Sequence, residues 1–77
     1  MRLEQITYFL RVAEHGNITA AAKSLYISQP ALSKQITLLE QEIGLPLFER
    51  QARGVILTRA GMQFQKDLQN ILKELEN

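Results

Sequence analysis

Apolar residues recur every three or four positions in several stretches of the chain, a spacing typical of helices that bury one face. The first stretch covers roughly residues 3–14 and ends at Gly16, which suits the left-handed conformation of a helix C-cap. We expect this helix to contribute to the core through one apolar stripe, made of Leu3, Ile6, Phe9, Leu10 and Ala13.

A second helix is expected to follow almost at once, capped by Asn17 or Thr19 and running to Leu25. Its alanines, residues 20–22, would let another helix approach closely. The alternative is that they occur there only because alanine has a high helix propensity. After a turn at residues 26–27, a third helix is expected close by. Two short helices joined by a tight turn are the layout of a helix-turn-helix, whose second helix enters the major groove of DNA.

The third helix is expected over residues 29–43, with Ser28 as its N-cap and Gly44 as its end. Its apolar residues lie on one side: Leu32, Ile36, Leu39 and Ile43. At 100° per residue the opposite side carries small polar groups and one cation, and no carboxylate that would repel phosphate. The residues on that face are Pro30, Ser33, Lys34 and Thr37, with Gln29 projecting from the leading end.

Two short strands are expected next, residues 47–50 and 55–57, around a turn at residues 52–54. The hairpin carries Arg50 and Arg53 near its tip. Beside a helix-turn-helix such a hairpin is a wing, and its arginines suit the minor groove or the phosphate backbone. The alternative is an ordinary hairpin made soluble by two arginines.

The last helix is expected over residues 59–75, with Thr58 as its cap. Its apolar residues repeat at heptad-like spacing. Part of this stripe can pack on the first helices, and its far end is expected to form a dimerisation seam. The seam residues are Phe64, Leu68, Ile71, Leu72 and Leu75. Binding to a membrane surface is the competing use, but Asp67, Glu74 and Glu76 disfavour anionic lipid.

The net charge is only +1, so the distribution of charges along the chain is more informative than their sum. No acidic residue occurs between Glu14 and Glu40, or between Arg50 and Lys66, and both windows contain cations. The chain has no cysteine and one histidine, which excludes disulfides and thiolate or zinc sites built on them. We expect one small, soluble, cytoplasmic domain of 77 residues without a cofactor.

The run AAKSLYISQPALSKQITLLEQEIGLPLFER, followed by GVILTRAG, resembles the N-terminal DNA-binding domain of the LysR-type transcriptional regulators. The resemblance covers essentially the whole chain, and many matches occur at the correct spacing. It implies a mostly α fold: a winged helix-turn-helix with a three-helix core and a short β-hairpin wing over residues 1–58, then a linker and dimerisation helix over residues 59–77. It also implies a bacterial transcription factor that binds double-stranded DNA as a homodimer, on a two-fold-related site.

The resemblance further implies roles for single residues. Base-edge contacts in the major groove fall to Gln29, Pro30, Ser33 and Lys34. Backbone, groove-edge and wing contacts fall to Ser28, Thr37, Arg50, Arg53 and Thr58. The chemistry agrees: glutamine can pair in two ways with adenine, lysine reaches the acceptors of guanine, and proline can touch a thymine methyl group.

The chain departs from the family pattern in two respects. Leu38 stands where many relatives have a basic or polar residue, which puts backbone contacts from that turn of the helix in doubt. Family members also continue into an effector-binding domain, to which nothing in these 77 residues corresponds. We therefore expect an excised DNA-binding domain, with any small-molecule effector bound by the missing domain.

Two functions from other classes compete with this interpretation. A protein-binding module could use the same outer face of the third helix, but that face offers no aromatic or large apolar anchor. A hydrolase could be assembled on paper from Ser28, Ser33, His15 and Asp67, yet no nucleophile motif surrounds either serine. His15 at the end of a helix favours the helix dipole instead. We therefore expect no enzymatic activity.

Overall fold

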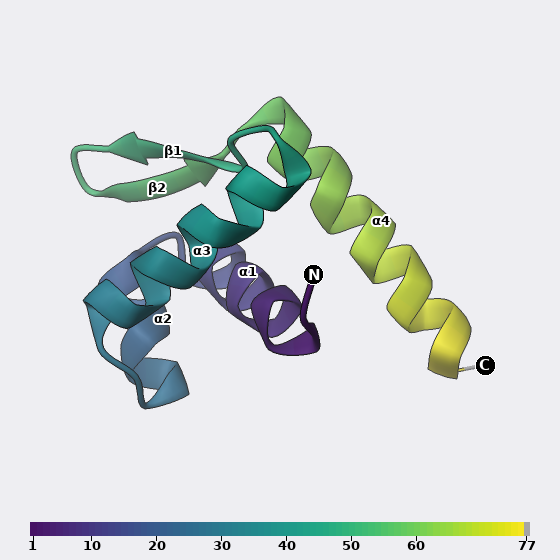
Figure 1. Cartoon of the computed structure of the whole chain (residues 1–77), viewed down its shortest axis with the longest axis horizontal. Coiled ribbons are helices and arrows are strands. Elements are labelled where there is room, and N and C mark those ends of the chain that lie inside the picture. Colours follow the sequence, from purple (N-terminus) through teal and green to yellow (C-terminus); the bar gives the residue numbers. More distant parts are fainter. Residues whose placement is uncertain (77) are drawn as a thin grey trace.

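The computed structural model describes residues 1–76; Asn77, the last residue of the expected linker helix, lies outside the described residues. Figure 1 shows three helices crossing one another, a β-hairpin, and a last helix leading away from them. In chain order the elements are α1 (Leu3–His15), α2 (Ile18–Leu25), α3 (Gln29–Ile43), β1 (Phe48–Gln51), β2 (Gly54–Leu57) and α4 (Arg59–Glu76). The mostly α winged helix-turn-helix predicted from the sequence is confirmed.

The core lies where α1, α2 and α3 cross. Ala21 and Ala22 are buried in it, so the small side chains of α2 do permit the close helix approach expected of them. The largest fully buried side chains come from α1, α3 and the start of the hairpin: Phe9, Leu32, Leu39, Leu47 and Val12. Burying a side chain of this size stabilises a fold by roughly 1.5–3 kcal/mol.

The apolar stripe of α1 differs from the predicted one at two positions. Leu3, the first residue of α1, is 77% exposed. Val12, which was not in the predicted stripe, is fully buried beside Phe9. Gln5 is also buried, and its side-chain oxygen accepts a hydrogen bond from the backbone N–H of Arg2 at 2.9 Å.

The three helices of the core begin and end at recognisable capping residues. The side chains of Asn17 and Ser28 accept hydrogen bonds from backbone N–H groups in the first turns of α2 and α3, as an N-cap does. Each helix ends in a residue with left-handed backbone: Gly16 after α1, Tyr26 after α2 and Gly44 after α3. Two of these residues are the glycines that such a position favours, and the third is a tyrosine.

The β1–β2 hairpin is antiparallel and its two-residue turn is formed by Ala52 and Arg53. The first strand is thus shifted by one position from the expected bounds, and the second starts one residue earlier, with Gly54 inside β2. The hairpin is held against the α1–α2 connection by a hydrogen bond from the N–H of Val55 to the carbonyl of Gly16, 3.0 Å long. A Cβ on Gly54 would lie only 2.2 Å from that same carbonyl oxygen, so the close approach requires glycine.

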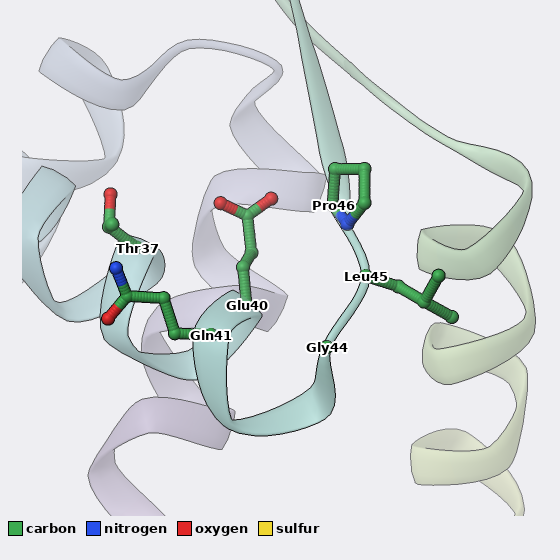
Figure 2. Close-up of a pocket in the computed structure, with 6 residues that line it drawn as sticks. All are labelled: Thr37, Glu40, Gln41, Gly44, Leu45 and Pro46. Atoms are coloured by element: carbon green, nitrogen blue, oxygen red, sulfur yellow. The ribbon is translucent and has the colours of Figure 1, made fainter.

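A second set of contacts joins α3, the hairpin and α4, and we call it the wing junction: Glu40, Pro46, Leu47, Phe48, Thr58 and Gly61. The Glu40 carboxylate accepts hydrogen bonds from the N–H groups of Leu47 (2.6 Å) and Phe48 (3.2 Å). On the other side of the junction, the Leu47 carbonyl accepts a hydrogen bond from the N–H of Thr58. In Figure 2 the Glu40 side chain projects from α3 toward the segment that carries Pro46.

The junction also positions the start of α4. The Thr58 hydroxyl donates to the Pro46 carbonyl at 2.6 Å and accepts from the N–H of Gly61 at 3.0 Å, which confirms Thr58 as the cap of α4. A Cβ on Gly61 would lie 2.1 Å from the Leu47 carbonyl oxygen. The helix can therefore approach the first strand this closely only with glycine at that position.

Helix α4 packs on the core through the part that ends at Leu68. The Phe64 ring meets Phe9 edge to face, with 4.9 Å between the ring centroids, and Leu68 is 6% exposed. Phe64 and Leu68 therefore pack on the core within one copy, and their part in a dimer seam stays a prediction. The other three predicted seam residues are exposed: Ile71, Leu72 and Leu75.

We predict that Glu40→Ala destabilises the fold, because it leaves the N–H groups of Leu47 and Phe48 without their acceptor where the backbone is covered. An unpaired buried donor costs roughly 1–3 kcal/mol, so thermal unfolding should show a midpoint lower by several degrees. Glu40→Gln keeps an oxygen acceptor and should lose less. Gln41→Ala is the matched control, because this neighbouring side chain is exposed. Equal stability of Glu40→Ala and Gln41→Ala would contradict the prediction.

Candidate nucleic-acid interface

The first two turns of α3 bring two predicted base-reading residues together. The side-chain amide nitrogen of Gln29 donates a hydrogen bond to the Ser33 hydroxyl oxygen, 2.7 Å away, across one helical turn. One amide hydrogen is used in this bond, which leaves the other hydrogen and the carbonyl oxygen of Gln29 available for a partner. That pair is the donor–acceptor combination that can bind the major-groove edge of adenine.

The remaining predicted contacts of α3 surround this pair. Pro30, Lys34 and Thr37 are exposed. The Ser28 hydroxyl oxygen accepts from the N–H of Ala31 at 3.2 Å, so its own hydrogen stays free for an external acceptor such as phosphate. The expected face of α3 is thus open to solvent.

The two arginines of the hairpin occupy different positions, one in the turn and one on a strand. Arg53 is exposed and lies in the two-residue turn at the tip. Arg50 pairs across the strands with Val55, whose side chain is buried, and paired residues point to the same face of a sheet. Arg50 therefore leaves the hairpin on its core-facing side, although it too is exposed. Of the two, Arg53 is the better placed to reach a large partner.

The predicted phosphate contact of Thr58 meets a competing use of its side chain. Its hydroxyl hydrogen is donated to the Pro46 carbonyl within the wing junction. Phosphate oxygens only accept hydrogen bonds, so this hydroxyl could donate to phosphate only after leaving Pro46. The geometry assigns Thr58 a structural role at the start of α4.

Two acidic residues near the interface have a placement that the sequence pattern did not predict. Glu40 ties α3 to the hairpin, but its partners lie seven and eight positions further along the chain, beyond any helical spacing. Glu49 places a carboxylate on β1, opposite Ile56 and on the other face from Arg50. Because successive side chains of a strand point to opposite faces, the expected strand 47–50 could have indicated that Glu49 and Arg50 lie on different faces.

A shallow depression of about 350 Å³ lies at the end of α3, between Thr37 and Pro46 (Figure 2). Within residues 1–76 no group of histidine, cysteine, aspartate or glutamate side chains could hold a metal ion. None of the helices in that range is long and apolar enough to cross a membrane.

The serines, the aspartate and the histidine that a hydrolytic set would need have separate roles. Ser28 caps α3, Ser33 accepts from Gln29, and Asp67 accepts from Gln63 at 2.9 Å within α4. His15 lies in the last turn of α1, where a cation interacts favourably with the helix dipole.

Comparison with known proteins finds relatives among transcriptional regulators. The chain is 51% identical to the HTH-type transcriptional regulator ClcR of Pseudomonas putida over 76 residues, 99% of this chain and 26% of ClcR. It is also 51% identical to the regulator TfdS of Cupriavidus pinatubonensis over 73 residues, 95% of this chain and 25% of TfdS. The chain thus spans about a quarter of the length of these relatives.

Solved structures agree with the sequence relatives. The DNA-binding domain of CbnR in complex with DNA matches with a TM-score of 0.89 at 45% identity, covering 99% of this chain and 87% of that one. The corresponding domain of BenM with its catB site 1 DNA matches with a TM-score of 0.89 at 39% identity, covering 99% and 82% of the two chains.

A family model for bacterial regulatory helix-turn-helix proteins of the LysR family matches residues 3–62, which is most of the chain. The matched range contains the three-helix core, the complete hairpin and the start of α4. The chain therefore belongs to the LysR family of bacterial regulatory helix-turn-helix proteins.

Proposed function

We propose that this chain is the double-stranded DNA-binding domain of a bacterial transcriptional regulator and that it reads a specific sequence. The observation that carries the proposal is its similarity to the CbnR and BenM domains, which were solved with DNA and match nearly the whole chain. Since the curated relatives are transcriptional regulators, we assign the domain no catalytic role. Recognition of any small-molecule effector would belong to residues outside this chain.

The first turns of α3 would read the bases in the major groove. Gln29 and Ser33 are partly buried and form a hydrogen-bonded pair at the leading end of α3, and Lys34 is exposed on the adjoining surface. The amide of Gln29 suits adenine, the ammonium group of Lys34 suits guanine, and the ring of Pro30 suits a thymine methyl group. Ser28 and Thr37 would contact the backbone or the edge of the groove.

The hairpin would act as the wing. Arg53 at its tip suits a phosphate or the narrow minor groove, and Arg50 would contribute a weaker backbone contact from the core-facing side. The wing junction fixes the hairpin relative to α3, so both elements would meet the DNA in a constant relative orientation. Figure 1 shows the hairpin tip and the first turn of α3 on the same side of the molecule, remote from the C-terminal end of α4.

The second half of α4 would hold two copies together. Ile71 is 54% exposed and Leu75 is 77% exposed, and both lie beyond the region that packs on the core. Large apolar side chains that recur at helical spacing without an internal partner suit a helix–helix seam. A homodimer would present two α3 helices to half-sites about one helical turn of DNA apart, or a multiple of that distance.

The experiment that tests the proposal is selection of bound duplexes from a random pool, followed by titration of the selected duplex and a scrambled one at two salt concentrations. The expected result is a site with approximate two-fold symmetry, bound at least about a thousandfold more tightly than the scrambled duplex. Binding of every duplex with equal affinity would overturn the sequence-reading role. No binding at low salt would overturn DNA binding altogether.

We predict that Gln29→Ala weakens binding to the selected duplex by about 1–3 kcal/mol and removes the preference at one base pair. The reason is the loss of the paired donor and acceptor that face the base edge. Titration against duplexes changed one base pair at a time measures this effect. Gln41→Ala, an exposed glutamine near the other end of the same helix, is the control. An unchanged preference at every base pair would show that Gln29 does not read the sequence.

We predict that Arg53→Ala weakens binding to the selected and scrambled duplexes alike and lowers the slope of log K against log salt by about one. Both effects follow from the loss of one cation that displaces counterions from phosphate. Lys73→Ala removes a cation from the last turn of α4 and should leave the slope unchanged. A loss confined to the selected duplex would contradict a backbone contact.

We predict that Ile71→Asp shifts the protein from dimer to monomer while leaving the fold intact, because this side chain is exposed within one copy. Sedimentation equilibrium measures the mass, and circular dichroism measures the helix content. Asn70→Asp adds the same charge at the neighbouring exposed position and serves as the control. An unchanged mass distribution in Ile71→Asp would exclude this part of α4 from the seam.

A further inference from the structure

Tyr26 is the one residue of the described chain other than glycine that has a positive φ, with φ 59° and ψ 37°. It ends α2 in a Schellman motif: its N–H donates to the Lys23 carbonyl, and the N–H of Ile27 donates to the Ala22 carbonyl at 3.1 Å. This motif requires left-handed backbone, which an L-residue with a Cβ adopts only at a cost.

The same position at the ends of α1 and α3 is filled by glycine, Gly16 and Gly44. Glycine at residue 26 would satisfy the same hydrogen bonds without that cost. The tyrosine side chain does not compensate by packing, since Tyr26 is 96% exposed. Neither the backbone nor the core of the chain explains a tyrosine here, so its side chain must be explained by something outside the chain.

Tyr26 stands immediately before the proposed reading end of α3. Gln29 is three positions further along the chain, a span of at most roughly 10 Å, while the major groove is about 12 Å wide. When the first turn of α3 lies in the groove, the turn at Tyr26 therefore lies at the rim, where the phosphates are. In Figure 1 the α2–α3 turn and the hairpin lie on opposite sides of the leading end of α3, so the two could contact different backbone segments.

The surroundings of Tyr26 favour a phosphate rather than another partner. No carboxylate occurs between Glu14 and Glu40, and Lys23 is exposed three residues before the turn. A phenol offers one hydrogen-bond donor on an apolar ring, which suits a phosphate oxygen and the adjoining deoxyribose.

We propose that Tyr26 contacts the DNA backbone at the edge of the major groove, with its hydroxyl donating to a phosphate oxygen. This inference rests on the proposed DNA-binding function and adds a contact to it. The contact fixes how deeply α3 enters the groove, and it carries no base preference of its own.

The test compares Tyr26→Gly, Tyr26→Phe and Tyr8→Phe in the titrations with selected and scrambled duplexes. Tyr26→Gly should bind both duplexes about tenfold more weakly, because a hydrogen bond to a charged group is lost. Its salt slope should be unchanged, since a neutral side chain releases no counterions. Its thermal midpoint should not fall, because the backbone strain is removed.

Loss of affinity without loss of stability is the outcome that a purely structural role cannot produce. Tyr26→Phe should bind as weakly as Tyr26→Gly, and full affinity of Tyr26→Phe would overturn the hydrogen bond to phosphate. Tyr8→Phe removes a hydroxyl from a partly buried tyrosine of α1 and should bind as the unaltered protein does.

The chain has two tyrosines and no tryptophan, so Tyr26 is the single tyrosine of the Tyr8→Phe variant. Labelled with 3-fluorotyrosine, this variant gives one ¹⁹F signal, which should shift on addition of duplex. An unshifted signal, or affinities of the Tyr26 variants within about twofold of the unaltered protein, would overturn the inference and turn attention to a protein partner. Failure of the unaltered protein to bind any duplex would instead overturn the proposed function.

Discussion

The arrangement of this domain depends on one carboxylate. Glu40 lies near the end of α3 and accepts hydrogen bonds from the first two N–H groups of the chain that returns toward the hairpin, those of Leu47 and Phe48. It therefore fixes the direction in which the chain leaves the helix. A charged acceptor shared by two backbone donors is stronger than a neutral one, and here it acts at the only covalent link between the reading helix and the wing. The relative orientation of α3 and the hairpin follows from it.

The aromatic cluster transmits this orientation to the rest of the fold. Phe9 of α1 lies 5.2 Å from the Phe48 ring and 4.9 Å from the Phe64 ring, measured between centroids. One side chain of the first helix thus touches the start of the hairpin and the start of the last helix. Aromatic pairs at such distances add to the stabilisation from burial alone. The segment from Leu47 to Phe48 thus takes part both in the polar contacts of the wing junction and in this apolar cluster.

Much of the fold could be predicted from the sequence because its signals are local. Ser28 as a cap and Gly44 as an end define α3 by residues within or beside the helix, and both predictions are confirmed. The contacts that were missed join positions far apart in the chain. Glu40 could not be matched with Leu47 by any periodicity, because the two residues are seven positions apart on different elements.

In the candidate DNA interface, too, the features with local signals could be predicted and those that depend on distant residues could not. The outward face of α3 could be predicted from helical spacing, since it follows from the positions of the apolar residues alone. The side of the hairpin from which Arg50 emerges depends on the strand register, and the hydroxyl of Thr58 depends on a partner twelve residues away. The role of Thr58 as the cap of α4 could be predicted because that signal is local, whereas its hydrogen bond to Pro46 became visible only with the wing junction.

The hydrogen bond between Gln29 and Ser33 has a consequence for how such a domain can change its target. Because the serine oxygen holds the glutamine amide, replacing either residue alters the surface that both present. A substitution at one position leaves the other side chain without its former partner, so a single mutational step would disturb the proposed contact surface of both residues. New target preferences on this helix would then evolve through paired substitutions one helical turn apart.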